Sequence, residues 1–382
     1  MQGGFETSEY QTRLAKAQSM MREHNLGALL LTTEPDVRYF TGFLTRFWES
    51  PSRPWFLIIP QEGRPIAVIP TIGAALMGKT WITDIRTWSA PDLVDDGVSL
   101  LARTLNEVVR KGRVGLPMGH ESHLRMPLAD YDRVGHLCPN IMFSEDQGIL
   151  RALRMVKSEA EIAKIKVACD VAARAFDRVP EIARDGVALD QVFRDFQRIC
   201  LEEGADWVPY LAGGAGPFGY DDVISPAKAE PLKQGDVLML DTGLVVDGYF
   251  CDFDRNFSVG APKPQISKAY DTLLEAVEAG KAAAKLGNLA SDVFAAMDAI
   301  VTGGQGTGDA GRLGHGLGMQ LTEWPSFIAG DATPLQEGMV ITLEPGVTVS
   351  DGCILVHEDN FVIRQDGIEQ LSPIAPKDMV VI

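Results

Sequence analysis

Two apolar, strand-like runs flank an Asp-Gly pair in the segment 238–255, and this feature constrains the fold more than any other. Asp247–Gly248 favours a two-residue type I′ turn, because both central residues of that turn need positive φ. In the resulting hairpin, Asp241 lies opposite Asp254, and side-chain alternation predicts that Asp252 shares their face. Like charges placed in this way repel, so the carboxylates must bind cations or retain protons. A divalent metal site is the simplest interpretation.

The size and composition of the chain limit the classes of protein to consider. Its 382 residues exceed what one hydrophobic core usually serves, so two domains are expected. No apolar run is long enough to span a bilayer, and the N-terminus lacks the basic and apolar regions of a signal peptide. Five scattered cysteines without a CxxC pair fit a reducing compartment, so the cytoplasm is expected. A net charge of −17 argues against nucleic-acid binding, because a phosphate backbone would repel it.

The first part of the chain has the pattern of a mixed α/β domain without a chemical motif of its own. Apolar residues at helical spacing predict helices over 8–24 and 99–110. A buried strand is expected at 28–32, and a hairpin is expected from the runs 55–59 and 66–69.

A change of pattern near residue 150 marks a second domain, so the expected domains are 1–148 and 149–382. Ser158–Glu161 has the pattern of a capping box and precedes a long apolar stripe at helical spacing. Two further helices are predicted, over 267–286 and 291–301, before a strand-rich C-terminus.

Two glycine-containing segments of the second domain allow weaker interpretations. Gly213–Gly219 is not a phosphate loop, because no Lys-Ser/Thr follows it, and we expect a backbone loop over the substrate pocket. Asp351–Gly352 is a second Asp-Gly turn beside acidic residues. It hints at an internal pseudo-repeat of strand pairs around one site.

Four short motifs follow the first hairpin in a specific order. They are Gly314–Gly318, with a central histidine, then Thr322–Pro325, Leu343–Gly346 and His357–Asp359. Each is weak alone, because a glycine-flanked histidine is more often structural and a Glu-Pro-Gly sequence is usually a turn. Their order and spacing after the hairpin are specific in combination.

This pattern resembles the creatinase/prolidase/methionine-aminopeptidase family, whose catalytic domain has the pita-bread fold. The resemblance covers nearly the whole chain and lies with the prolidase and creatinase branch. It implies an α+β protein with a smaller α/β creatinase-type N-terminal domain and a pita-bread C-terminal catalytic domain. The family's five metal ligands correspond to Asp241, Asp252, His315, Glu344 and Glu358.

The resemblance implies that these residues hold two divalent metal ions. Four carboxylates and one imidazole suit Mn, Fe or Co, with Zn also possible. Two ions that share carboxylates can hold a bridging hydroxide near neutral pH, and in the family's peptidases it attacks an amide bond. The resemblance assigns proton transfer to Glu344, and Glu323 is included among the catalytic candidates. A solvated face that merely gathers these groups is the alternative.

The chain departs from the family at two positions that contact substrate. The family's peptidases carry a histidine seventeen or eighteen residues before the first metal aspartate, which here is Val223 or Ile224. They carry another in an HExP motif, where this chain has Thr322. Threonine can donate a hydrogen bond but cannot act as a cation or as an acid near pH 7. Thr322 is therefore a candidate substrate-binding residue, and peptide hydrolysis is in question.

Two positions close to the expected ligands also depart from the family pattern. Asp254 stands where the family has threonine, and it could be an extra ligand, a proton carrier or a nucleophile. The alternative is a carboxylate paired with the adjacent Arg255 or with another cation. His357 replaces an aliphatic residue before Glu358, and we interpret it as a residue that packs behind the ligands.

The segment 46–55 of the N-terminal domain combines aromatic residues with arginines. In prolidase-like dimers this domain reaches towards the active site of the partner subunit. Arg46, Trp48 and Arg53 could therefore hold a small zwitterion, because tryptophan attracts a cation and arginine grips a carboxylate. Ordinary domain or dimer packing is the alternative. A homodimer is implied by the resemblance alone.

Three functions remain open at this point. The first is a dinuclear metallopeptidase of Xaa-Pro type that acts on short peptides. The second keeps the metal site but acts, as a hydrolase or lyase, on a small zwitterionic metabolite of the creatine, ectoine or dimethylsulfoniopropionate type, with Asp254 catalytic. The third is a non-catalytic pita-bread binding module, which the retention of all five ligands argues against. The first function is preferred.

Overall fold

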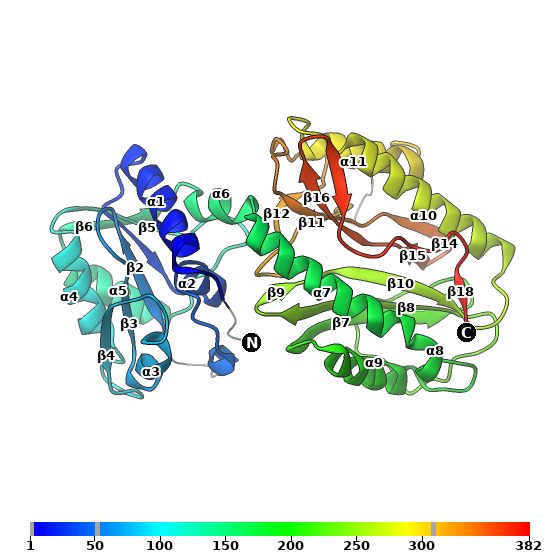
Figure 1. Cartoon of the computed structure of the whole chain (residues 1–382), viewed down its shortest axis with the longest axis horizontal. Helices are drawn as coiled ribbons and strands as arrows, with labels where there is room; N and C mark the ends of the chain where they lie inside the picture. The colour runs from blue at the N-terminus through cyan, green and yellow to red at the C-terminus, as the bar shows by residue number, and fades with distance from the viewer. Residues whose placement is uncertain (1–3, 50–53, 307–310) are drawn as a thin grey trace. The chain divides into compact units, whose positions relative to one another are not determined.

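The computed structural model of the chain divides into two compact units, unit 1 (Met1–Arg154) and unit 2 (Met155–Ile382), shown in Figure 1. It describes residues 4–49, 54–306 and 311–382. Helices and sheets occur in both units, which confirms the α+β class expected from the sequence.

Unit 1 is built on one six-stranded sheet with the strand order β4-β3-β2-β1-β5-β6. The expected hairpin forms, because β2 and β3 pair antiparallel, while β1 pairs antiparallel with β2 and parallel with β5. The strands are β1 Ala28–Leu31, β2 Phe56–Pro60, β3 Ile66–Pro70, β4 Asp84–Trp88, β5 Gly112–Leu116 and β6 Ile141–Glu145. The helices are α1 Thr7–Glu23, α2 Glu34–Thr41, η1 Arg46–Glu49, η2 Thr71–Gly73, α3 Ala74–Met77, α4 Val98–Val108, α5 Leu128–Leu137 and α6 Ile149–Met155, which ends at the boundary of the unit.

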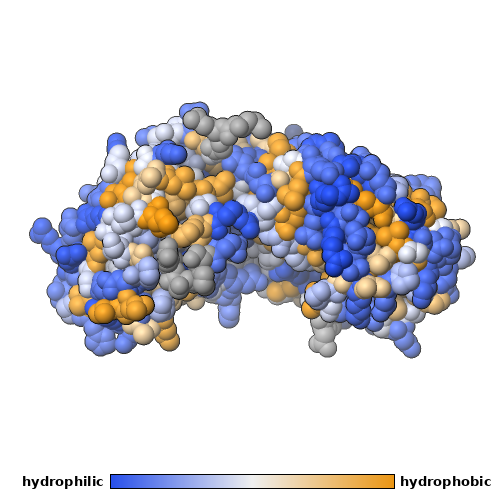
Figure 2. Space-filling view, turned by 90° about the horizontal axis from the view of Figure 1, so that it is seen from below, coloured by the Kyte–Doolittle hydropathy of each residue, from blue (hydrophilic) through white to orange (hydrophobic). Residues whose placement is uncertain are grey.

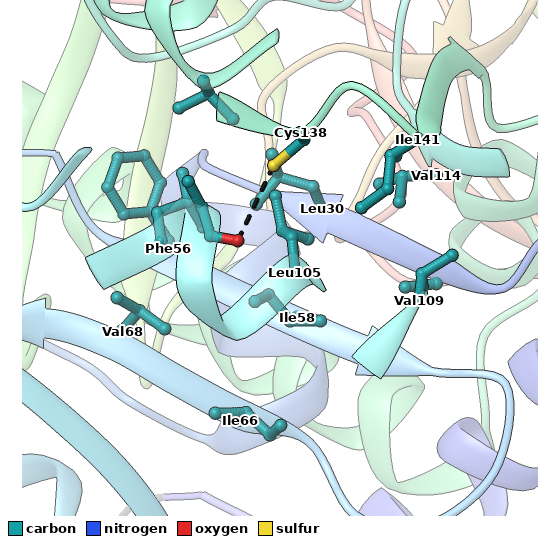
Figure 3. Close-up of a cluster of buried hydrophobic side chains, with 14 of the residues drawn as sticks. Leu30, Phe56, Ile58, Ile66, Val68, Leu105, Val109, Val114, Cys138 and Ile141 are labelled. Atoms are coloured by element: carbon teal, nitrogen blue, oxygen red, sulfur yellow. Dashed lines mark hydrogen bonds between the residues drawn. The ribbon is translucent and has the colours of Figure 1, made fainter. Parts of the chain in front are cut away.

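The interior of unit 1 is apolar. Leu30 and Ile58 of the central strands lie beside Leu105 of α4, as Figure 3 shows. The thiol of Cys138 joins this cluster and donates a weak hydrogen bond of 3.6 Å to the carbonyl of Ala102. Burying a large apolar side chain contributes about 1.5–3 kcal/mol, so this cluster stabilises unit 1.

Unit 2 contains two five-stranded sheets and one two-stranded sheet. The first has the order β18-β10-β8-β7 with β9 on β8, the second has the order β12-β11-β13-β16-β17, and β14 pairs with β15. The strands are β7 Trp207–Gly216, β8 Val237–Val246, β9 Tyr249–Phe250, β10 Phe253–Ser258, β11 His315–Gly316, β12 Glu323–Ser326, β13 Val340–Leu343, β14 Gly346–Ser350, β15 Cys353–Val356, β16 Asp359–Arg364, β17 Gly367–Gln370 and β18 Val380–Val381. The helices are α7 Glu159–Asp177, α8 Val179–Ile182, α9 Leu189–Glu203, α10 Pro264–Ala283 and α11 Ala290–Val301.

Helices cover the sheets of unit 2 in pairs. Helices α7 and α9 contact each other, α7 contacts β8 and α9 contacts β7. Helices α10 and α11 form a second pair, of which α10 contacts β14 (Figure 1). The predicted capping box starts α7, where the Ser158 hydroxyl accepts from the Glu161 N–H at 3.3 Å and the Glu161 carboxylate accepts from the Ser158 N–H at 3.0 Å.

The Asp-Gly hairpin forms in the register expected from the sequence. Asp247 and Gly248 have φ values of 47° and 77°, the positive values that a type I′ turn requires. Asp241 of β8 lies directly opposite Asp254 of β10. The strand pair therefore presents the two carboxylates on one face.

The segment 213–219 corrects an expectation, because its first part is not a loop. Residues 213–216 belong to β7 and pair with β8. A β-carbon on Gly213 would collide with the carbonyl oxygen of Met239, so the close approach of the two strands requires glycine there. The glycine-rich composition reflects strand packing, and it was wrongly interpreted as a substrate loop.

The surface and the thiols give little further indication of partners. Hydrophilic side chains cover much of the face of unit 2 that Figure 2 presents. Among the described residues, no helix combines the length and apolar character needed to cross a bilayer. All five cysteines are free thiols.

Candidate metal centre

The five expected ligands belong to two different sheets of unit 2. Asp241 lies on β8, and Asp252 lies between β9 and β10 of the same sheet. His315 lies on β11, Glu344 directly follows β13 and Glu358 directly precedes β16, all strands of the second sheet. Residues separated by more than a hundred positions therefore supply one cluster.

The centre of the cluster is formed by three buried groups. The His315 Nε2 atom lies 3.4 Å from Asp252 Oδ2 and 3.8 Å from Glu358 Oε1. One ligand atom from each of the three residues lies within 4.8 Å of the others. Nitrogen and oxygen atoms bind divalent transition metals at about 2.0–2.2 Å, so an ion between these groups would reach all three.

The His315 ring is oriented for binding a cation. Its Nδ1 atom lies 2.8 Å from the carbonyl oxygen of Gly316, and a hydrogen on Nδ1 donated to that oxygen leaves Nε2 free for a metal. Burial, followed by the positive charge of Arg312, lowers the pKa of His315 to about 4. The imidazole is therefore neutral at pH 7, as a metal ligand must be.

Each of three carboxylates around His315 has one oxygen without a hydrogen-bond partner among the described residues. Asp241 Oδ1, Asp252 Oδ1 and Glu358 Oε1 are buried and accept no hydrogen bond from any described residue. Burial raises the pKa of each of these carboxyls well above its usual value, and the neighbouring carboxylates raise it further. A buried carboxylate oxygen without a donor costs free energy, which a bound cation would offset. The donor set fits divalent ions.

Glu344 has different surroundings from the other carboxylates. The residue is partly exposed, although its carboxyl group is enclosed. Burial raises the pKa of Glu344 to about 7, and the charge of Arg312 opposes the shift. A carboxyl that titrates near the working pH is suited to proton transfer.

Asp254 and His357, which both depart from the family pattern, are partners. Asp254 Oδ1 accepts from the His357 ring at Nδ1 (3.1 Å) and from the Glu358 N–H (2.9 Å). The guanidinium of Arg255 forms its ion pair with Asp359 at 2.9 Å, and the ring that contacts the Asp254 carboxylate is that of His357. Burial acts to lower the pKa of His357, but the charges of Asp359 and Asp254 outweigh it and raise the pKa to about 9.

Thr322 and Glu323 both contact cationic side chains. Arg312 donates from Nη2 to the Thr322 hydroxyl at 3.2 Å. Glu323 Oε2 lies 3.0 Å from Lys157 Nζ, in an ion pair whose side chains are both buried, and Glu323 Oε1 accepts from the Gln320 N–H at 3.1 Å. Both oxygens of Glu323 thus have partners, and its catalytic assignment stays a prediction.

The N-terminal segment 46–55 is only partly described. Trp48 is buried in an aromatic cluster, with the guanidinium carbon of Arg125 5.2 Å from its ring. Arg46 is exposed and lies 3.5 Å from Glu49. Arg53 lies outside the described residues. The burial of Trp48 fits the alternative of ordinary packing. Substrate binding by these residues stays a prediction.

Two residues that the sequence analysis did not single out support the cluster. Asn360 accepts from the Asp252 N–H at 2.9 Å and donates to the Asp252 carbonyl, which fixes this ligand across the two sheets. Arg312 places a positive charge beside Glu344. The only signal in the sequence is that each lies two or three residues from an expected ligand.

Comparisons with known proteins point to one class of relative. A probable dipeptidase PepE of Mycobacterium tuberculosis is 29% identical over 384 residues, which cover 99% of this chain and 98% of that protein. The Xaa-Pro dipeptidase of Pyrococcus horikoshii is 30% identical over 60% of this chain and 66% of its own length. The crystal structure of dipeptidase PepE from Mycobacterium ulcerans superposes with a TM-score of 0.84 at 27% identity and covers both chains completely. A prolidase from Thermococcus sibiricus, with a TM-score of 0.87 at 23% identity and complete coverage of both chains, shows the same fold.

Family models cover both units of the chain. Residues 13–156 match the creatinase/prolidase N-terminal domain, and residues 163–365 match metallopeptidase family M24. The predicted resemblance, the two-domain architecture and the hydrolase class are confirmed, which sets the non-catalytic module aside. The chain therefore belongs to metallopeptidase family M24, with a creatinase/prolidase domain preceding its metal-dependent hydrolase domain.

Proposed function

We propose that this chain is a dinuclear metallopeptidase that cleaves short peptides, with Xaa-Pro dipeptides as its preferred substrates. The observation that carries the proposal is the set of buried carboxylate oxygens around His315 Nε2 that accept no hydrogen bond from the described residues. Relatives named as dipeptidases and as an Xaa-Pro dipeptidase support a peptide substrate. The proposed ligands of two divalent ions (Mn, Co, Fe or Zn) are Asp241, Asp252, His315, Glu344 and Glu358.

Different residues of the chain have different roles around these ions. When bound, two such ions supply Lewis acidity towards the carbonyl to be cleaved and a water nucleophile at neutral pH. Glu344, to which the resemblance assigns proton transfer, takes up a proton at its carboxyl and delivers it to the amine that leaves. The buried pair of Lys157 and Glu323 fixes the start of β12 and so positions the preceding Thr322.

Arg312 and Thr322 are proposed to hold the carboxylate of the substrate. The 3.2 Å hydrogen bond between them places a guanidinium and a hydroxyl side by side, and both residues are only partly buried. Guanidinium groups bind carboxylates through paired, charge-assisted hydrogen bonds. This pair would supply the positive charge that an imidazole at position 322 would otherwise provide.

A small zwitterionic metabolite is the second candidate substrate, and the histidine content of the chain favours it. Beyond residue 136 the chain has only two histidines, His315 and His357. His357 is buried between Asp254 and Asp359. Unit 2 therefore offers no imidazole in the role that the two missing histidines have in the family's peptidases. In this case Asp254 would act as a catalytic group.

The test is amino-acid release from a panel of Xaa-Pro dipeptides and tripeptides by protein loaded with Mn or Co, with a chelated control. Chelator-sensitive release of proline is expected, together with weaker release from the corresponding dipeptide amides, because these lack the carboxylate that Arg312 would bind. Replacing Thr322 by histidine, as in the family's peptidases, should raise the peptidase rate, and Thr322→Ser is the matched control. Absence of release from protein shown to contain metal would transfer the assignment to the zwitterionic metabolite.

The assembly and location of the protein remain predictions. A homodimer with Arg46, Trp48 and Arg53 near the partner's active site is expected from the resemblance, and light scattering of the purified protein would measure the mass first. The cytoplasmic location follows only from the cysteine pattern.

A further inference from the structure

Asp254 has one oxygen that the hydrogen bonds of the protein do not use. The residue is 1% exposed, and its Oδ1 atom accepts both of the hydrogen bonds described above, from His357 and from the Glu358 N–H. Its Oδ2 atom is buried and accepts no hydrogen bond from any described residue. The cross-strand pairing places this carboxylate on the same face as Asp241, which is one of the expected ligands.

The hydrogen bonds behind Asp254 hold it rigidly. The His357 ring is bound on both sides, because Nδ1 contacts Asp254 Oδ1 and Nε2 contacts Asp359 Oδ2, each at 3.1 Å. Asp359 is fixed in turn by Arg255 at 2.9 Å and by the Ser372 hydroxyl at 2.7 Å. Each member of this series is less than a tenth exposed. A carboxylate anchored through one oxygen presents the other in a fixed direction.

We propose that Asp254 is an additional metal ligand of the centre, and that His357 is the positioning residue that presents its free oxygen. This inference rests on the proposed metal site but not on the identity of the substrate. A purely structural role would account for Oδ1 and would leave a buried, charged oxygen without a partner, which costs free energy. Coordination of a divalent ion by Oδ2 removes that cost.

The inference explains why two departures from the family pattern occur together. Threonine in place of Asp254 would carry no charge, and an aliphatic residue in place of His357 would have nothing to donate. The two side chains contact each other directly, so each change is most useful in the presence of the other. The added carboxylate brings one more negative charge to the ions and should favour hard ions that bind oxygen, such as Mn.

The experiment titrates Co(II) into the full-length, metal-stripped protein and follows heat and visible absorption, which report affinity and coordination independently of activity. Asp254→Thr should weaken the binding of one ion by at least about 10-fold and change the absorption of bound cobalt, since groups that only orient ligands already cost about 10–100-fold in affinity. His357→Val should give a smaller change in the same direction. The double variant should be no weaker than Asp254→Thr, because the two residues act as one unit.

Controls separate coordination from folding. Asp298→Asn alters another buried aspartate of unit 2, which lies on α11 and accepts from the Thr302 hydroxyl, and should leave cobalt binding unchanged. Asp254→Asn keeps the shape of the side chain and an oxygen that can accept from His357, so weaker cobalt binding by this variant would report the loss of the charged oxygen and not a loss of packing.

The outcomes also distinguish this inference from the proposed function. Wild-type affinity and an unchanged cobalt spectrum in Asp254→Thr would overturn it, and so would a wild-type protein that binds no cobalt. A protein that binds two ions, loses one of them in Asp254→Thr and cleaves no peptide would support the inference while the proposed peptidase activity fails.

Discussion

Buried carboxylates of unit 1 and those of the candidate metal centre in unit 2 have opposite surroundings. In unit 1, Asp36 accepts from Arg154 at 2.8 Å and from the Thr33 hydroxyl at 2.6 Å. Asp146 accepts from the N–H of Leu150 at 2.9 Å, at the start of α6. These carboxylates therefore complete the local structure and leave nothing for a ligand.

In the candidate metal centre of unit 2, the same chemical group has oxygens that accept no hydrogen bond from a described residue. Asp252 is about as buried as Asp36 (3% and 5% exposed), but one of its oxygens accepts no hydrogen bond from a described residue. Its neighbours are carboxylates, which raise its pKa further after burial has raised it. Burial alone therefore does not identify a functional acid in this fold, whereas burial without a donor does.

The largest expected effect comes from removing a buried carboxylate that has an oxygen without a hydrogen-bond donor. Asp252→Asn should weaken metal binding by more than about 100-fold, because outer groups that merely orient ligands are worth about 10–100-fold. The hydrolytic activity should be lost with the metal. Elemental analysis after dialysis against a weak chelator measures the first effect. If Asp252→Asn retains two ions per chain, Asp252 contributes no more to metal binding than the aspartates of unit 1 do.

The matched substitution in unit 1 should change stability instead of metal content. Asp36→Asn removes the charge that pairs with Arg154, and breaking a buried ion pair costs about 3 kcal/mol. Urea denaturation would show the loss as a lower midpoint. Metal bound per folded molecule should stay at the wild-type value. A loss of metal in this variant would contradict the contrast between stabilising carboxylates in unit 1 and metal-binding carboxylates in unit 2.

The smallest expected effect is a dependence of the metal-free protein on pH. The folded-state pKa values of Glu344 (about 7) and His357 (about 9) lie above the ordinary values of 4.5 and 6.5, so the folded state binds more protons. Stability from such groups is complete below the ordinary pKa and is lost as the pH rises through the raised one. Metal-free protein should therefore melt at a lower temperature at pH 9 than at pH 6.5, by roughly 3 °C.

Calorimetry with and without metal checks this pH dependence. The metal-loaded protein should show a smaller fall, or a rise, over the same range, because the ions compensate the ionised carboxylates of unit 2. His315, whose pKa is lowered to about 4, contributes only below pH 6.5 and does not oppose the effect in this window. Equal slopes with and without metal would show that the cluster does not bind it.

The sequence predicted the local features of the site well. The register across Asp247–Gly248 and the capping box at Ser158 depend on residues close together in the chain, where turn and cap preferences act directly. The glycines of 213–216 were placed in a loop because the steric demand of β8 on β7 has no local signature.

Contacts between the two sheets of unit 2 could not be predicted. In the sequence, Asp254 and His357 were two separate departures from the family pattern. Nothing in the sequence showed that they are in contact, because 103 positions separate them. The hydrogen bonds between Asn360 and Asp252 also join the two sheets. The ion pair of Lys157, which precedes α7, with Glu323 of β12 likewise joins distant parts of the chain. Such contacts follow from the packing of whole sheets and not from local periodicity.

The division of the ligands between two sheets has a kinetic consequence. Asp241 and Asp252 come from one sheet, whereas His315, Glu344 and Glu358 come from the other. An ion held by ligands from both sheets would link the two layers, and its release would require them to separate. The residence time of the metal would then depend on the opening of unit 2 more than on the exchange of single ligands, so the protein would keep its metal through dilution and release it on partial unfolding.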